Sequence, residues 1–156
     1  MTIDKLFLHN LITEKLLGTN YEVITLNVSA QNDIILEVDC LEGVDVEFCA
    51  TLNHYLTEQL DAAGILDYSL EVGGVCLTDP FKTKMQYNKH LNHDVEVLAK
   101  DGKKYHGVLV SVDEDTFSVD VERMVSVEGK KRKQKEIQTL TFAYADVKYT
   151  RYDLKV

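Results

Sequence analysis

Two histidines separated by two residues come closest to a metal-ligand pair in this sequence. His90 and His93 leave Leu91 and Asn92 between them, and Asp94 follows with one carboxylate. A structural zinc site needs four tetrahedral ligands, mostly thiolates and imidazoles, and no cysteine lies near this pair. We therefore expect His90 and His93 to be polar surface residues, and we predict neither a metal site nor a cofactor.

A pair of carboxylates, Glu37 and Asp39, is the second arrangement that could do chemistry. They alternate with Leu36 and Val38, so a strand would put both on its outer, solvated face. Acid–base catalysis would need the two groups desolvated and their pKa values separated. The sequence also lacks GxSxG, P-loop, GxGxxG and HExxH motifs. We predict no catalytic residues, no small-molecule substrate and a protein that is not an enzyme.

The three cysteines do not form a disulfide or zinc pattern. Cys40, Cys49 and Cys76 are odd in number, widely spaced and without a CxxC pair, and Cys40 and Cys49 fall at apolar positions where we expect core residues. No apolar run approaches the roughly 18 residues of a membrane span, and the N-terminus has no export signal. We expect a cytoplasmic protein without a membrane partner.

The most concentrated charge in the sequence is a run of five cations within residues 130–135. Such a run, placed at a hairpin tip after Gly129, would neutralise several phosphates and give salt-dependent binding without base specificity. The alternative is a solvated loop that keeps the protein soluble. The candidate phosphate contacts are the run and a lysine pair in an earlier turn: Lys130, Lys131, Arg132, Lys133, Lys135, Lys103 and Lys104.

Charge divides the chain into two halves. Residues 1–79 hold two basic and fourteen acidic residues, a net charge of −12, whereas residues 80–156 hold fifteen and twelve, a net charge of +3. This asymmetry favours different partners for the two halves. The sole proline, Pro80, stands at the change, so we predict domains 1–79 and 80–156. The expected linker residues are Gly73, Gly74, Leu77, Asp79 and Pro80.

The first half shows helical and strand periods in the order helix, strand, strand, helix, strand. Apolar spacing predicts one helix from a Thr2 cap to Gly18 and another from an Asp45 cap to Gly64. Period-two alternation predicts three strands, the first two joined by a turn at residues 31–33. Their inner faces would be Ile24, Leu26 and Val28; Ile34, Leu36, Val38 and Cys40; and Tyr68, Leu70 and Val72. Two helices on one face of a mixed sheet make an α+β domain.

The second half is almost all strand. We expect a short helix over residues 84–91 and five strands, at 95–99, 105–112, 117–121, 137–142 and 147–152. Asp101-Gly102 is a strong two-residue hairpin signal between the first two strands. Five short strands are too few for a sandwich, so we expect the sheet to close into a small barrel.

These residues resemble the RimP family of bacterial ribosome maturation factors over nearly the whole chain. The order of elements, residues 92–98, residues 101–109 and residues 145–148 carry the resemblance. It implies a C-terminal SH3-like, Sm-like barrel and a factor that binds the immature small (30S) ribosomal subunit and assists its assembly. The implied partners are rRNA and, for the acidic half, a basic small-subunit ribosomal protein.

The chain departs from the family pattern in its linker. The family carries an aspartate–arginine pair before its last proline, and Thr78 and Asp79 stand there in this chain. A role for that pair therefore does not carry over. A rival interpretation is an Sm-like, ring-forming single-strand RNA binder, because Asp101-Gly102 and Asp113 also resemble the first Sm motif. That family places a base-binding asparagine where Phe117 stands here, so we rank the ring second.

Overall fold

The computed structural model describes residues 3–125, 129 and 134–154. The chain divides into two compact units, Met1–Cys76 and Leu77–Val156, named here the N-terminal and C-terminal units. Both combine helix and strand, so the α+β class predicted from the sequence is confirmed.

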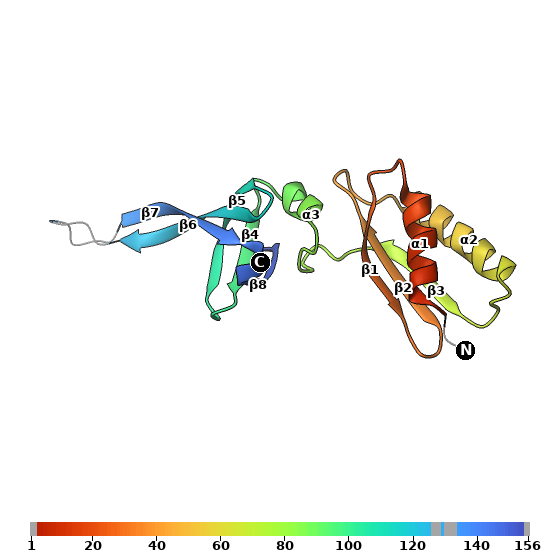
Figure 1. The fold of residues 1–156 in the computed structure, drawn as a ribbon. Coiled ribbons are helices and arrows are strands. Elements are labelled where there is room, and N and C mark those ends of the chain that lie inside the picture. Colours follow the sequence, from red (N-terminus) through yellow and green to blue (C-terminus); the bar gives the residue numbers. More distant parts are fainter. Residues whose placement is uncertain (1–2, 126–128, 130–133, 155–156) are drawn as a thin grey trace. The chain divides into compact units, whose positions relative to one another are not determined.

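The N-terminal unit is a three-stranded mixed sheet with two helices on one face (Figure 1). Strand β2 lies in the centre, antiparallel to β1 and parallel to β3. A parallel neighbour requires a crossover, and helix α2 provides it. The elements are α1 (Lys5–Leu16), β1 (Glu22–Val28), β2 (Asp33–Asp39), α2 (Val46–Ala62) and β3 (Ser69–Gly74).

Aspartate side chains start both helices. Asp45 caps α2 as predicted, because its carboxylate accepts a hydrogen bond of 3.0 Å from the backbone N–H of Glu47. Helix α1 is capped by Asp4, whose carboxylate accepts from the N–H of Leu6 at 3.0 Å. The predicted cap, Thr2, lies outside the described residues.

The core of the N-terminal unit lies between the helices and the sheet. It contains Leu8, Ile12 and Leu16 of α1, Cys49, Leu52, Leu56 and Leu60 of α2, and Leu26, Ile34, Leu36 and Val38 of the sheet. One predicted face is partly wrong. A bulge in β1 between Val23 and Thr25 makes Ile24 the extra residue, so Val23 packs against the core in its place.

The prediction that Glu37 and Asp39 both lie on the solvated face of β2 is wrong for Asp39. Asp39 is only 2% exposed, and its carboxylate accepts a hydrogen bond of 2.9 Å from the N–H of Cys40. Strand β2 ends at Asp39, and the chain turns directly after it, where the N–H of Gly43 donates to the carbonyl of Cys40 at 3.2 Å. Alternation along the strand does not report this turn.

The C-terminal unit contains the predicted short helix and all five predicted strands. They are α3 (Lys84–Lys89), β4 (Asp94–Ala99), β5 (Lys104–Val112), β6 (Thr116–Val125), β7 (Gln134–Ala143) and β8 (Val147–Tyr152), with a 3-10 turn, η1 (Tyr144–Asp146), before β8. The strand order is β7-β6-β5-β4-β8, with antiparallel neighbours throughout. Among the described residues, no pairing joins β7 to β8, so the sheet is open in its hydrogen bonding.

Aromatic side chains fill the core of this unit. Phe117 is fully buried, and its ring lies 4.9 Å from that of Tyr87, between ring centroids. Tyr87 comes from α3, and its hydroxyl bonds the hydroxyl of Thr150 at 2.9 Å. Phe117 therefore serves packing at the position where an Sm protein would place its asparagine.

His90 is not the surface residue that we predicted. It is 9% exposed, and its ring stacks on Phe81 with centroids 4.7 Å apart. His90 follows α3 as its C-terminal cap residue, which turns the ring toward Phe81. His93 is exposed, as predicted.

Strands β6 and β7 continue past the rest of the sheet. They pair with each other from Thr116–Val125, but β6 pairs with β5 only as far as Val121. Residues 122–125 and 134–137 therefore form a two-stranded ribbon that projects beyond β5 (Figure 1).

Candidate functional site

The predicted phosphate contacts that the structure describes lie on two different hairpins. Lys103 and Lys104 lie in and after the β4–β5 turn, and both are exposed. Asp101 fixes that turn by accepting from the N–H of Lys103 at 2.9 Å, and Gly102 has the positive φ of 92° that the turn needs. Lys135 lies on the β6–β7 ribbon. Lys130, Lys131, Arg132 and Lys133 lie outside the described residues.

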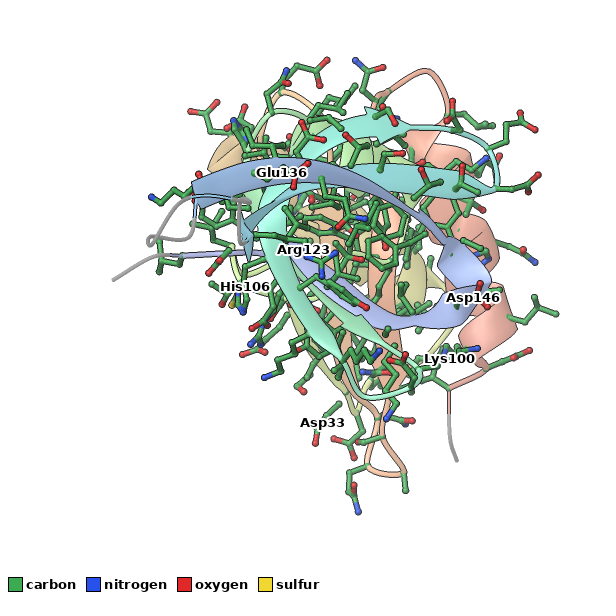
Figure 2. All side chains as sticks on the ribbon, turned by 90° about the vertical axis from the view of Figure 1, so that its left-hand side faces the viewer. Asp33, Lys100, His106, Arg123, Glu136 and Asp146 are labelled. Carbon is green, nitrogen blue, oxygen red and sulfur yellow. The ribbon has the colours of Figure 1, made fainter. Side chains whose placement is uncertain are left out.

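Acidic side chains accompany the cations of the ribbon. The ammonium of Lys135 is 3.9 Å from the carboxylate of Glu122, and both side chains are mostly exposed. Arg123 is the register partner of Glu136 (Figure 2). Exposed pairs of this kind contribute at most about 1 kcal/mol, so Lys135 can exchange Glu122 for a phosphate.

The predicted linker residues lie partly at the end of β3 and partly in the segment between β3 and α3. Gly73 and Gly74 are the last residues of β3 and pair with Glu37 and Val38. Leu77, Asp79 and Pro80 lie between β3 and α3, and Leu77 is 56% exposed.

A charged cluster that sequence reasoning missed lies across β4, β5 and β8. Glu96 pairs with His106 on one side and Arg151 on the other. The Glu96 carboxylate accepts hydrogen bonds from the Tyr149 hydroxyl at 3.0 Å and from Arg151 Nε at 2.6 Å. His106 Nε2 is 3.7 Å from the Glu96 carboxylate, and its Nδ1 is 3.0 Å from that of Asp153. His106 is labelled in Figure 2.

Two opposing effects set the pKa of Glu96. Burial raises the pKa, but hydrogen bonds from Tyr149 and Arg151 and the charges of Arg151 and Lys104 bring it below its usual range. The carboxylate therefore stays ionised and neutralises Arg151. Alternation alone would place Glu96 opposite Val95 and Val97, but nothing local reveals partners more than fifty residues away.

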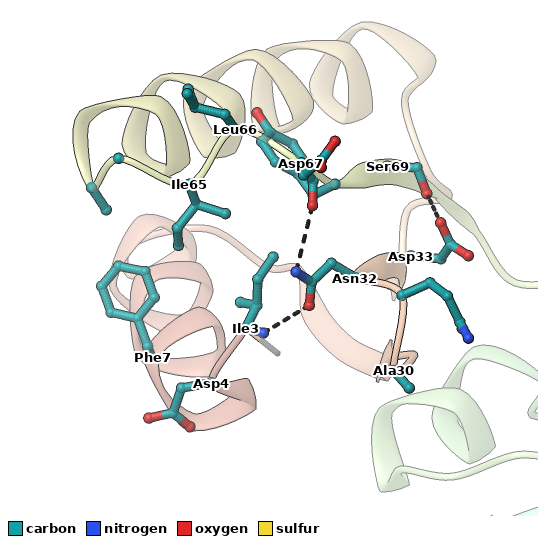
Figure 3. Close-up of a pocket in the computed structure, with 14 residues that line it drawn as sticks. Ile3, Asp4, Phe7, Ala30, Asn32, Asp33, Ile65, Leu66, Asp67 and Ser69 are labelled. Atoms are coloured by element: carbon teal, nitrogen blue, oxygen red, sulfur yellow. Dashed lines mark hydrogen bonds between the residues drawn. The ribbon is translucent and has the colours of Figure 1, made fainter. Parts of the chain in front are cut away.

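A pocket in the N-terminal unit is acidic. Its volume is about 1100 Å³, and its walls come from the start of α1, the β1–β2 turn and the α2–β3 loop (Figure 3). We name it the acidic pocket. Three carboxylates line it, those of Asp4, Asp33 and Asp67, beside the apolar side chains of Phe7 and Leu66, and none of its described lining residues is basic.

Asn32 holds the walls of the acidic pocket together. Its side-chain oxygen accepts from the N–H of Ile3 at 2.8 Å, and its side-chain NH₂ donates to the carbonyl of Asp67 at 3.4 Å. Asn32 has a φ of 62°, a conformation that asparagine tolerates better than most residues. Ser69 adds a bond of 2.7 Å to Asp33 (Figure 3). The pocket is therefore formed before any partner binds.

Metal-binding and membrane-spanning features are absent from the residues that the structure describes. Within that part of the chain, no group of three His, Cys, Asp or Glu side chains could hold a metal ion. None of its helices is long and apolar enough to cross a membrane. All three cysteines are free thiols; Cys40 and Cys49 are buried, as predicted, and Cys76 is exposed.

Fold and charge together define a class: two-unit α+β proteins whose two units carry net charges of opposite sign. Comparison with known proteins gives the family. Two curated relatives, both named ribosome maturation factor RimP, come from Porphyromonas gingivalis strains W83 and ATCC 33277. They are 33% and 32% identical over 146 residues, which cover 94% of this chain and 95% of each relative. The chain belongs to the RimP family. No family model matches it.

Proposed function

We propose that this protein is a cytoplasmic, non-enzymatic ribosome maturation factor that binds the immature small (30S) ribosomal subunit and assists its assembly. The observation that carries the proposal is the relation to two RimP proteins over 94% of the chain. The charge division of the chain supports it, because an assembling subunit offers both anionic RNA and cationic protein.

The N-terminal unit would bind a basic small-subunit ribosomal protein. Residues 1–79 carry a net charge of −12, which repels rRNA and attracts lysine and arginine side chains. The acidic pocket is a suitable place, because its carboxylates can hydrogen-bond the charged heads while Phe7 and Leu66 contact the aliphatic stems. Crosslinking should map this unit onto ribosomal protein; crosslinks mainly to rRNA would contradict the assignment.

The C-terminal unit would contact rRNA through phosphates. The residues proposed are Lys103, Lys104, Lys135 and the run from Lys130 to Lys133. We also propose that its sheet is an SH3-like, Sm-like barrel. Support comes from β8, which returns to pair with β4 and so lets five antiparallel strands curl around one aromatic core.

Recovery of the tagged full-length protein from a lysate of its own host tests the proposal. We expect it to bring down particles that contain precursor small-subunit rRNA. Equal recovery of both mature subunits, or of neither, would overturn the proposal. Gel filtration tests the ring-forming alternative: we expect a monomer near 17.7 kDa, whereas an Sm-like ring would elute several-fold larger.

A further inference from the structure

A second pocket, in the C-terminal unit, carries the opposite charge. Its volume is about 270 Å³. We name it the lysine pocket. It lies between the segment that leads into α3 and the segment that joins η1 to β8. Its lining residues are Phe81, Lys82, Thr83, Lys84, Tyr87, Tyr144, Val147, Lys148 and Tyr149.

The charge of this pocket is one-sided. Lys82, Lys84 and Lys148 line it and are all exposed, and none of the other described lining residues is acidic. Three lysines among the residues that line so small a space, in a chain of net charge −9, favour an anionic ligand.

Aromatic rings form much of the remaining wall. Tyr144 and Tyr149 are half-buried, and each is fixed by its hydroxyl. Tyr144 donates to the carbonyl of Asp113 at 2.8 Å, and Tyr149 donates to Glu96 at 3.0 Å. Rings held in this way beside cations match the way in which proteins bind single-stranded nucleic acid, with bases on aromatic side chains and phosphates on lysines.

The walls are fixed before a ligand arrives. The N–H of Phe81 donates to the carbonyl of Thr150 at 2.8 Å, which ties the segment before α3 to β8. Thr83 and Gln86 form a capping box that fixes the start of α3. On the opposite wall, a bulge in the β4–β8 pairing leaves Lys148 as the extra residue, and bulges redirect side chains in this way.

The guanidinium of Arg151 lies over one face of the Tyr149 ring, 5.0 Å from its centroid, so a base would use the other face. We propose that the lysine pocket binds one unpaired nucleotide of single-stranded RNA, with the base against that face of Tyr149 and its phosphates on Lys84 and Lys148. The volume is below that of pockets for drug-sized ligands, roughly 300 to 1,000 Å³, and suits a single base. Bases in an RNA duplex are stacked and cannot enter. The proposal rests on the proposed function, since it names a subsite within the rRNA contact.

The test is binding of full-length protein to a fluorescein-labelled eight-nucleotide oligouridine. Lys84→Ser with Lys148→Ser should weaken binding at least tenfold and lower the salt slope by about 1.4, or 0.7 for each phosphate that a lysine neutralises. The matched control, Lys5→Ser with Lys100→Ser, has the same charge change outside the pocket and should bind like the wild type. An equally large weakening in both double variants would overturn the proposal.

Tyr149 variants separate stacking from charge. Tyr149→Leu should weaken oligouridine binding about 5-fold or more, the equivalent of 1 kcal/mol of stacking, and should leave binding of an abasic oligomer unchanged. Tyr149→Phe keeps the ring and should bind like the wild type, which shows that removal of the hydroxyl bond to Glu96 is not the cause. Thermal melting checks folding, and the lysine variants decide the question if Tyr149→Leu does not fold.

Two further results would overturn the inference. One is unchanged oligouridine binding in both the lysine variant and Tyr149→Leu. The other is competition by oligoglutamate as strong as by unlabelled oligouridine, which would indicate an acidic protein segment as the ligand. Recovery of precursor subunits by the wild type tests the proposed function separately, so a failure of one does not imply a failure of the other.

Discussion

Glu96 links three strands of the C-terminal sheet through one carboxylate. It is 8% exposed and hydrogen-bonded to Tyr149 and Arg151, so its charge is compensated inside the fold and only hydrated in the unfolded chain. Hydrogen bonds to a charged group stabilise by about 1.5 to 3 kcal/mol. The residue therefore matters for stability in a pH-dependent way.

We expect Glu96→Gln to lower the free energy of unfolding by about 1 to 2 kcal/mol at pH 7. The folded-state pKa of Glu96 is below its usual value of 4.5, so its contribution is full above that value and is lost as the pH falls through the folded pKa. The difference between variant and wild type should therefore shrink in acid. Urea unfolding at several pH values measures it, with Glu136→Gln, at an exposed position, as the control. A difference that grows in acid would contradict the assignment.

Single residues were predictable where the cause is local. Asp45 at the start of α2 could be identified because a cap and its helix are adjacent in sequence. The burial of Asp39 and His90 could not, because it depends on chain segments that cover them. The acidic pocket and the lysine pocket could not be predicted from the sequence for the same reason, since each combines residues from different segments of the chain.

At the scale of elements, the periods of the sequence predicted every α-helix and strand that the structure describes. The bulges were missed, at Val23/Thr25 in β1 and Leu98/Ala99 in the β4–β8 pairing, because an extra residue has no compositional mark. Gly107 on β5 is another such point. A Cβ there would lie 2.2 Å from the carbonyl oxygen of Asp120 on β6, so the two strands can approach only with glycine at this position.

Gly107→Ala should therefore lower the free energy of unfolding by about 1 to 3 kcal/mol, the usual cost of overpacking. Gly73→Ala is the matched control, since a Cβ at that strand position meets nothing within 4 Å, and it should be neutral or slightly stabilising. Denaturant unfolding of both variants decides the matter. Equal stability would show that β5 and β6 can separate at no cost.

The cationic run between β6 and β7 is an element-scale prediction about binding. Replacing Lys130, Lys131, Arg132 and Lys133 by serine should weaken binding to precursor subunits at low salt. The salt slope should fall by about 0.7 to 0.9 for each phosphate that the variant no longer neutralises. Melting temperature serves as the folding control. An unchanged slope would identify the run as a solubilising loop and leave the other proposed phosphate contacts, Lys103, Lys104, Lys135 and the lysine pocket.

For the whole molecule, the sequence is informative about charge and order of elements, because both are sums over the chain. Whether the two halves fold independently is a further prediction. Leu77 is 56% exposed and lies in the segment between β3 and α3. The next fixed point of the chain is Phe81, whose N–H donates to the carbonyl of Thr150.

Limited chymotrypsin digestion should cut within residues 74–80 and leave two protected fragments, identifiable by mass. Leu77→Asn removes the exposed apolar site and should slow that cut without changing the unfolding midpoint. A single resistant core, or a first cut within residues 45–63, would argue against two independent domains.

The parallel pairing of β2 with β3 has a consequence for synthesis of the protein. Asp33 pairs with Ser69, and Val38 with Gly74, so each contact joins residues 36 positions apart. While the chain is still being translated, β2 has only β1 as a neighbour, and one side of the nascent sheet stays open until residue 74 has left the exit tunnel. The N-terminal unit must therefore complete its fold late, when nearly half of the chain has emerged from the ribosome, and a truncated nascent chain would expose a strand edge that favours aggregation.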